Sequence, residues 1–231
     1  MTVQDFMRLP DNQRRKMAVG PDLLTSAQYK TAISIASQLP NLVVEKAFFK
    51  VVGERFVTPS SLVQLVLKAR VTPPGSTNIP PLDPKDLEDP DPKEGDLDAL
   101  HGRGKNDMTS KAVQPPLAHA PYFARDHSPR WHVFLADAKQ GKIAVPPFTF
   151  STFDNGPLFD AEGKPTFNVQ TLRMQFGAPP QPGRYTFVMH VVSDSYVGMD
   201  TKMDVALEVE DAAKAEEMES EGEISEPEGG E

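Results

Sequence analysis

The most informative absence in this chain of 231 residues is cysteine, of which there is none. A chain without cysteine cannot form disulfides, ligate an iron–sulfur cluster or build a thiolate zinc site, and it suits a reducing compartment such as the cytosol. Basic residues are also in deficit, because 24 Lys and Arg stand against 33 Asp and Glu and leave a formal net charge of -9. Proteins that bind duplex nucleic acid usually carry a basic face, so we expect no nucleic acid as a partner.

Long apolar runs are missing as well. No stretch of the sequence approaches the ~20 consecutive apolar residues that span a bilayer. The N-terminus also lacks the charged, apolar and small-residue regions of a signal peptide. We therefore expect no direct membrane insertion by this fragment.

Residue patterns typical of catalysis or metal binding are not evident either. The five histidines have no zinc-like spacing. The stretch 89–100, "DPDPKEGDLDAL", has a displaced glycine and a leucine where a calcium loop needs glutamate, which favours an exposed acidic loop. Ser193, Asp194 and Ser195 lie near His190, but no glycines of a nucleophile elbow surround them, so they are interpreted as turn residues. The sequence predicts no enzyme, no cofactor and no metal.

Residues 1–40 predict a helical segment. Thr2 with Asp5 is a helix-capping pattern, and Pro10 limits the first helix to about two turns. A second short helix is expected before Gly20, and the clearest one, at 25–39, ends at Pro40.

Residues 41–209 predict a β-sandwich. Apolar residues alternate with polar ones in 62–71, which indicates a half-buried strand whose polar side faces solvent. About seven short strands, a single Trp131 expected in the core and the segment "PGRY" at the start of a late strand are typical of an immunoglobulin or fibronectin type III-like sandwich. The expected fold class is therefore mainly β with an N-terminal α part.

Two segments break this pattern. The proline-rich part at about 72–120 has few large apolar residues, and such a composition cannot offset the entropy lost on ordering, so we expect a flexible, disordered insertion. Residues 210–231 contain ten Asp and Glu and one Lys. They are expected to form a disordered acidic tail.

Three stretches resemble a known family: 48–75 "FFKVVGERFVTPSSLVQLVLKARVTPPG", 120–151 "APYFARDHSPRWHVFLADAKQGKIAVPPFTFS" and 185–212 "YTFVMHVVSDSYVGMDTKMDVALEVEDA". They resemble the cytosolic C-terminal (Brl) region of the fungal J-domain translocation protein of the endoplasmic reticulum (ER), the large membrane subunit of the post-translational Sec translocon. The sequence has neither the His-Pro-Asp tripeptide of a J-domain nor a membrane span, so we expect a fragment that begins partway through the helical region. The alternative is an accessory Brl-type domain of a spliceosomal RNA helicase.

The resemblance implies a module on the cytosolic side of the ER membrane. It implies that residues 1–40 belong to a small helical bundle, and that the sandwich docks on cytosolic loops of the Sec channel and promotes gating. The acidic tail would recruit a companion translocon subunit through that subunit's basic N-terminal segment, alongside other membrane subunits of the complex.

Two sites follow as candidates. The turn at Glu54 and Arg55 is a tentative channel contact, although an ordinary charged turn is an equal interpretation. Ser220 and Ser225 each have a glutamate three residues later, which is an acidic context for phosphorylation, and phosphate would add negative charge. The tail is interpreted as a binding segment, with a merely solubilising tail as the alternative. Its partner-binding residues are Glu216, Glu217, Glu219, Glu221, Glu223, Glu226 and Glu228.

Overall fold

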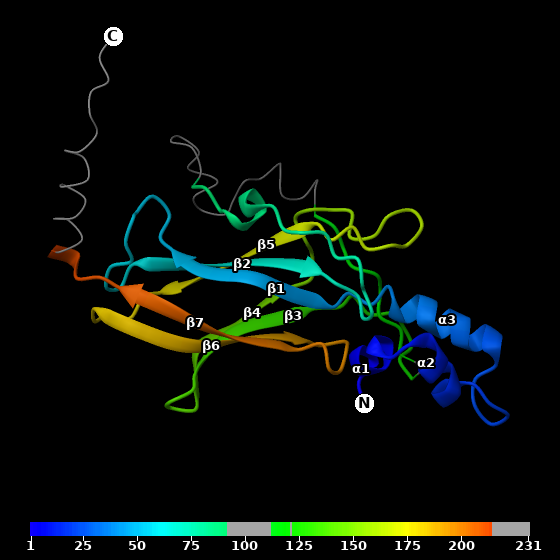
Figure 1. The fold of residues 1–231 in the computed structure, drawn as a ribbon. Helices are drawn as coiled ribbons and strands as arrows, with labels where there is room; N and C mark the ends of the chain where they lie inside the picture. Colours follow the sequence, from blue (N-terminus) through cyan, green and yellow to red (C-terminus); the bar gives the residue numbers. More distant parts are fainter. Residues whose placement is uncertain (92–111, 121, 214–231) are drawn as a thin grey trace, which may run out of the picture.

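Three short helices open the chain and seven strands follow them (Figure 1). The computed structural model describes residues 1–91, 112–120 and 122–213. The helices are α1 (Val3–Arg8), α2 (Asp11–Ala18) and α3 (Ser26–Ala36), with the 3-10 helix η1 (Pro84–Leu87). The strands are β1 (Leu42–Lys50), β2 (Leu62–Val71), β3 (Trp131–Asp137), β4 (Lys142–Phe150), β5 (Val169–Gly177), β6 (Gly183–Ser193) and β7 (Thr201–Val209).

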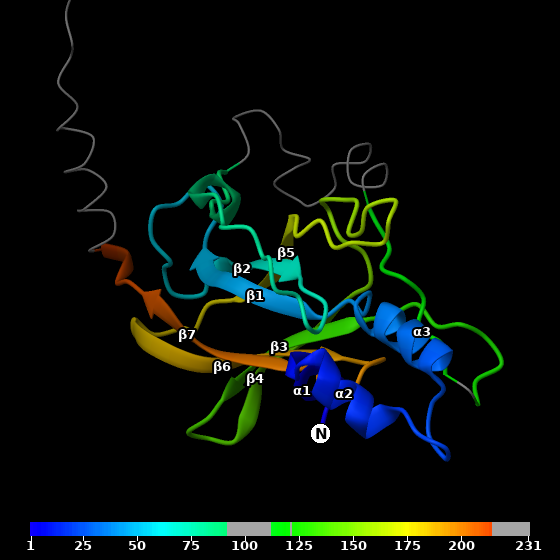
Figure 2. The same cartoon turned by 45° about the vertical axis from the view of Figure 1, so that its right-hand side comes forward.

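The strands form two antiparallel sheets that pack face to face (Figures 1 and 2). One sheet has the order β1-β2-β5 and the other the order β4-β3-β6-β7. β1 and β2, β3 and β4, and β6 and β7 are hairpin neighbours, whereas β5 returns to the first sheet and pairs with β2. The predicted fold class is therefore confirmed: mainly β, with an N-terminal α part and a seven-stranded sandwich.

The core lies between the sheets and follows the alternation of the sequence. Inward positions of β2, β6 and β7 are buried, because side chains at every second residue of a strand share a face. These residues are Val63, Leu65, Leu67, Ala69, Phe187, Met189, Val191, Val205, Leu207 and Val209. Trp131 is buried as expected and packs against Phe150 and Phe153 at ring-centroid distances of 5.8 and 5.3 Å. Such aromatic contacts stabilise a sandwich core beyond their buried area.

A tyrosine at the start of β6 closes the corner between the sheets. Tyr185 Oη donates a hydrogen bond to the carbonyl oxygen of Gln181 at 2.9 Å. Immunoglobulin-like sandwiches use the same arrangement, in which a tyrosine hydroxyl bonds to backbone a few residues upstream. This contact explains the "PGRY" segment.

The three predicted helices are confirmed. Thr2 and Thr25 form capping boxes with Asp5 and Gln28, which satisfy backbone N–H groups at the starts of α1 and α3. Tyr29 is the largest buried side chain of this segment, and its hydroxyl donates to Asp11 Oδ1 at 2.8 Å.

The helices and the C-terminal end of β7 lie at opposite ends of the sandwich (Figures 1 and 2). At the helix end, Gln4 Nε2 donates to Asn41 Oδ1 at 2.9 Å, just before β1. At the other end, which we call the tail end, the N–H of Glu210 donates to the carbonyl of Val57 at 2.8 Å. The division of the chain into domains stays a prediction, since much of the insertion and most of the tail lie outside the described residues.

Candidate functional site

Residues 80–91, here called the strap, lie across the outer face of the β1-β2-β5 sheet (Figure 1). Arg70 of β2 donates to the carbonyl of Pro80 at 2.8 Å. Lys46 and Lys50 of β1 donate to the carbonyls of Leu87 and Asp89 at 3.4 and 2.7 Å. The strap is part of the expected insertion, and its composition does not predict these contacts.

Asp89 is the centre of the contact. Its side chain is only 4% exposed, and each strand of the sheet contributes one cation to it. Lys50 Nζ of β1 lies 2.8 Å from Oδ2, Lys68 Nζ of β2 lies 3.9 Å from Oδ1, and Arg173 of β5 donates to both oxygens. The prediction of an exposed acidic loop from "DPDPKEGDLDAL" is therefore wrong for its first residue, Asp89. The side chain of Asp89 lies against the sheet, where three cations neutralise it.

The pKa directions agree with this geometry. Burial acts to raise the pKa of Asp89, but hydrogen bonds from Arg173 and Lys50 outweigh it, and the pKa is lowered. Burial lowers the pKa of Lys68, and the attraction of Asp89 offsets only part of that change. The cluster is thus a desolvated group of charges held by mutual pairing.

The strap also explains why β2 is buried on both faces. The sequence predicts that its polar residues face solvent, and this is wrong, since Gln64, Lys68 and Arg70 are at most 9% exposed. Arg70 pairs with Glu45 at 2.6 Å in addition to its bond to the strap. Period-two alternation indicates which residues share a face, but it does not indicate what covers that face.

The strap ends against the predicted channel-contact turn. Asp91 accepts hydrogen bonds from Lys50 Nζ and from the backbone N–H of Gly53, both at 2.8 Å. Gly53 has φ +79°, a left-handed conformation that glycine adopts without steric strain. Glu54 and Arg55 follow it, and both are exposed. The structure thus places the two predicted residues at the tail end of the sandwich, on a turn whose first residue the strap anchors.

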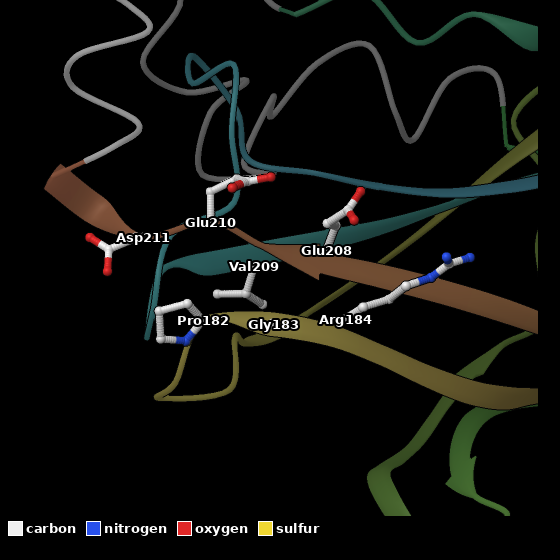
Figure 3. Close-up of a pocket in the computed structure, with 7 residues that line it drawn as sticks. All are labelled: Pro182, Gly183, Arg184, Glu208, Val209, Glu210 and Asp211. Atoms are coloured by element: carbon white, nitrogen blue, oxygen red, sulfur yellow. The ribbon is translucent and has the colours of Figure 1, made fainter.

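The acidic tail begins at the same end. A shallow cavity of about 340 Å³ lies between the start of β6 and the end of β7, lined by Arg184, Glu208, Glu210 and Asp211 among others (Figure 3). The carboxylates in Figure 3 point outward around the last residues of β7. Ser220, Ser225 and the seven predicted glutamates from Glu216 to Glu228 lie outside the described residues.

The histidines do not form a catalytic arrangement within the described residues. Asp194 accepts from Ser195 Oγ at 2.6 Å and from Arg130 Nε at 2.9 Å, and lies 3.1 Å from His127 Nε2. Burial acts to raise the pKa of Asp194, but these hydrogen bonds lower it well below its usual range. The serine and the histidine both face the carboxylate, which ties the β6–β7 turn to the segment before β3.

His190 stacks on Phe134 at a ring-centroid distance of 4.8 Å. In 1–91, 112–120 and 122–213, no group of three or more His, Asp or Glu is placed to hold a metal ion. The same residues contain no helix with the length and apolarity needed to cross a membrane.

Sequence comparison relates the chain to translocation proteins. It is 25% identical over 97% of its length to "Translocation protein sec63" of Schizosaccharomyces pombe, and 27% identical over 84% to "Protein translocation protein SEC63" of Saccharomyces cerevisiae. The mouse "Translocation protein SEC63 homolog" is 26% identical over 45% of the chain. No family model matches.

The chain spans about a third of the length of the two fungal relatives, 34% and 31% respectively. The resemblance inferred from the sequence is confirmed: the chain is similar to the Sec63 translocation proteins of fungi over most of its length, and to the mouse homologue over 45% of it.

Proposed function

We propose that this chain is a non-enzymatic interaction module of the ER post-translational protein translocation machinery, acting on the cytosolic face of the membrane. The observation that carries the proposal is the similarity to a named translocation protein over 97% of the chain. The described residues are consistent with it, since the two most heavily paired carboxylates, Asp89 and Asp194, are each held by neighbouring cations.

The sandwich docks on cytosolic loops of the Sec channel through its tail end and promotes gating there. The turn at Glu54 and Arg55 is the contact that we favour, because it is exposed, carries both signs of charge and is anchored at Gly53 by Asp91. Loops held by a rigid scaffold are common binding elements.

The acidic tail recruits a companion subunit through that subunit's basic N-terminal segment, and phosphate on Ser220 and Ser225 strengthens the attraction. The negative charge already begins on the described residues Glu208, Glu210 and Asp211. Charge complementarity of this kind mainly speeds association and is weakened by salt. Since the tail leaves beside Val57, both partners approach the same end of the sandwich.

A pull-down from solubilised ER membranes tests the tail. The full chain should retain channel and companion subunits, whereas a chain lacking residues 211–231 should lose the companion alone. A chain whose tail glutamates are replaced by glutamine keeps the length of the tail and serves as the matched control for charge. Equal retention of the companion by all three chains, at low and high salt, would refute tail recruitment.

A charge reversal tests the turn. Glu54→Lys should weaken channel binding and leave companion binding intact, because the tail is unchanged. Glu162→Lys is the matched control. Glu162 is exposed and lies in the loop before β5, and β5 begins at the helix end of the sandwich, away from the turn. Channel retention by Glu54→Lys equal to that of the control would remove the turn from the interface.

A further inference from the structure

The outer face of the β1-β2-β5 sheet is basic. Its three strands contain five cationic residues and a single acidic one, Glu45. The cations are Lys46, Lys50, Lys68, Arg70 and Arg173. Glu45 pairs with Arg70, so the negative charge that neutralises Lys50, Lys68 and Arg173 comes from the strap.

Hydrogen bonds and ion pairs join the strap to the sheet. No residue of 80–91 is buried as a whole, although the side chain of Asp89 is only 4% exposed and Leu82 and Leu87 are partly covered. No β-bridge joins it to a strand in the described part of the chain. Its anchors are two carboxylates and the backbone carbonyls of Pro80, Leu87 and Asp89.

Contacts of this kind are not specific to the strap. Any extended peptide has backbone carbonyls, and the side chains of alternate residues in an extended chain point to the same side. Asp89 and Asp91 are such an alternate pair, separated by Pro90, and both reach Lys50. A peptide with two carboxylates at this spacing therefore reproduces the principal anchors of the strap.

We propose that the basic outer face of the β1-β2-β5 sheet is a binding surface for an extended acidic peptide of a partner protein, and that the strap is an intramolecular occupant which the peptide displaces. The tether gives the strap a high effective concentration, so it excludes weak acidic ligands and admits only a partner with more or better-placed carboxylates.

Displacement has a consequence for the β1–β2 turn. Asp91 holds the N–H of Gly53, which precedes Glu54 and Arg55. When the strap leaves, this N–H loses its acceptor and the turn loses its anchor, so binding of an acidic peptide on the sheet face alters the conformation of the turn. This step concerns the isolated chain and does not depend on the proposed channel contact.

Fluorescence anisotropy with a labelled synthetic peptide of residues 87–93, "LEDPDPK", tests the proposal on the full chain. The wild-type chain should bind this probe weakly. The Asp89→Asn/Asp91→Asn variant, whose own strap is weakened, should bind it at least about tenfold more tightly, with an affinity that falls as salt is raised. Adding Lys50→Gln should abolish the gain, and the neutral peptide "LENPNPK" should not bind.

Asp86→Asn is the matched control, because Asp86 is an exposed carboxylate of the same strap. It should bind the probe as the wild type does. The proposal is overturned if the double variant, folded by near-ultraviolet circular dichroism, binds the probe no better than the wild type, or if the neutral peptide binds equally well. Should the double variant fail to fold, Asp91→Asn alone decides the question, since this side chain is 39% exposed.

Discussion

Asp89→Asn removes the charge at the centre of the strap contact and keeps the shape of the side chain. In the wild type this carboxylate is 4% exposed, accepts hydrogen bonds from Lys50 and Arg173, and lies 3.9 Å from Lys68 Nζ. The amide cannot neutralise these cations, so Lys68 keeps its desolvation without its counter-ion, and Lys50 keeps only Asp91. We therefore expect a lower free energy of unfolding.

The magnitude follows from the burial. Removing one partner of a fully buried ion pair costs about 3–5 kcal/mol, whereas an exposed pair contributes only about 0–1 kcal/mol. Apart from the Asp89 side chain, the strap is exposed or only partly covered, so it can lift from the sheet and return the cations to water, which limits the loss to the free energy of docking. We expect a decrease of about 2–3 kcal/mol for Asp89→Asn, between these limits.

Urea unfolding followed by the fluorescence of Trp131 measures this loss. Trp131 is the single tryptophan of the chain and is 1% exposed, so its emission reports on the core. Asp86→Asn is the control, and its free energy of unfolding should stay within about 0.5 kcal/mol of the wild type. An Asp89→Asn midpoint and slope equal to those of the control would show that the strap contributes nothing to stability, and the reasoning from burial would be refuted.

Two further predictions concern the corner and the response to acid. Tyr185→Phe should lower the free energy of unfolding by about 1 kcal/mol, because the carbonyl of Gln181 loses its donor, whereas Tyr122→Phe, on a fully exposed ring, should change nothing measurable in the same urea assay. Asp89, Asp91 and Asp194 have lowered pKa values in the folded chain, so their contribution to stability is complete above the ordinary carboxyl pKa of 3.8 and is lost as the pH falls through the folded values. Thermal melting from pH 6 downward should therefore show a loss of stability below about pH 4 that is smaller in Asp194→Asn, and an unchanged acid response in that variant would contradict the assignment.

The elements of the fold are predictable from local patterns. Thr2 and Thr25 indicate the starts of α1 and α3, because a capping side chain and its partner lie three residues apart in the sequence. The inward rows of β2, β6 and β7 follow from strict alternation, and Trp131 follows from its place on a central strand. These signals are short-range, so a single sequence carries them.

The sequence determined the strands, the helix caps and the abundance of charge at the tail, while the tertiary structure decided what covers β2. Asp89 meets Lys50, 39 residues before it, and Arg173, 84 residues after it. No local pattern indicates which of many carboxylates will neutralise a given lysine, since that pairing depends on how two distant segments approach across a folded sheet. The basic face and its strap are therefore evident only in the tertiary structure, where three strands bring their cations to one carboxylate.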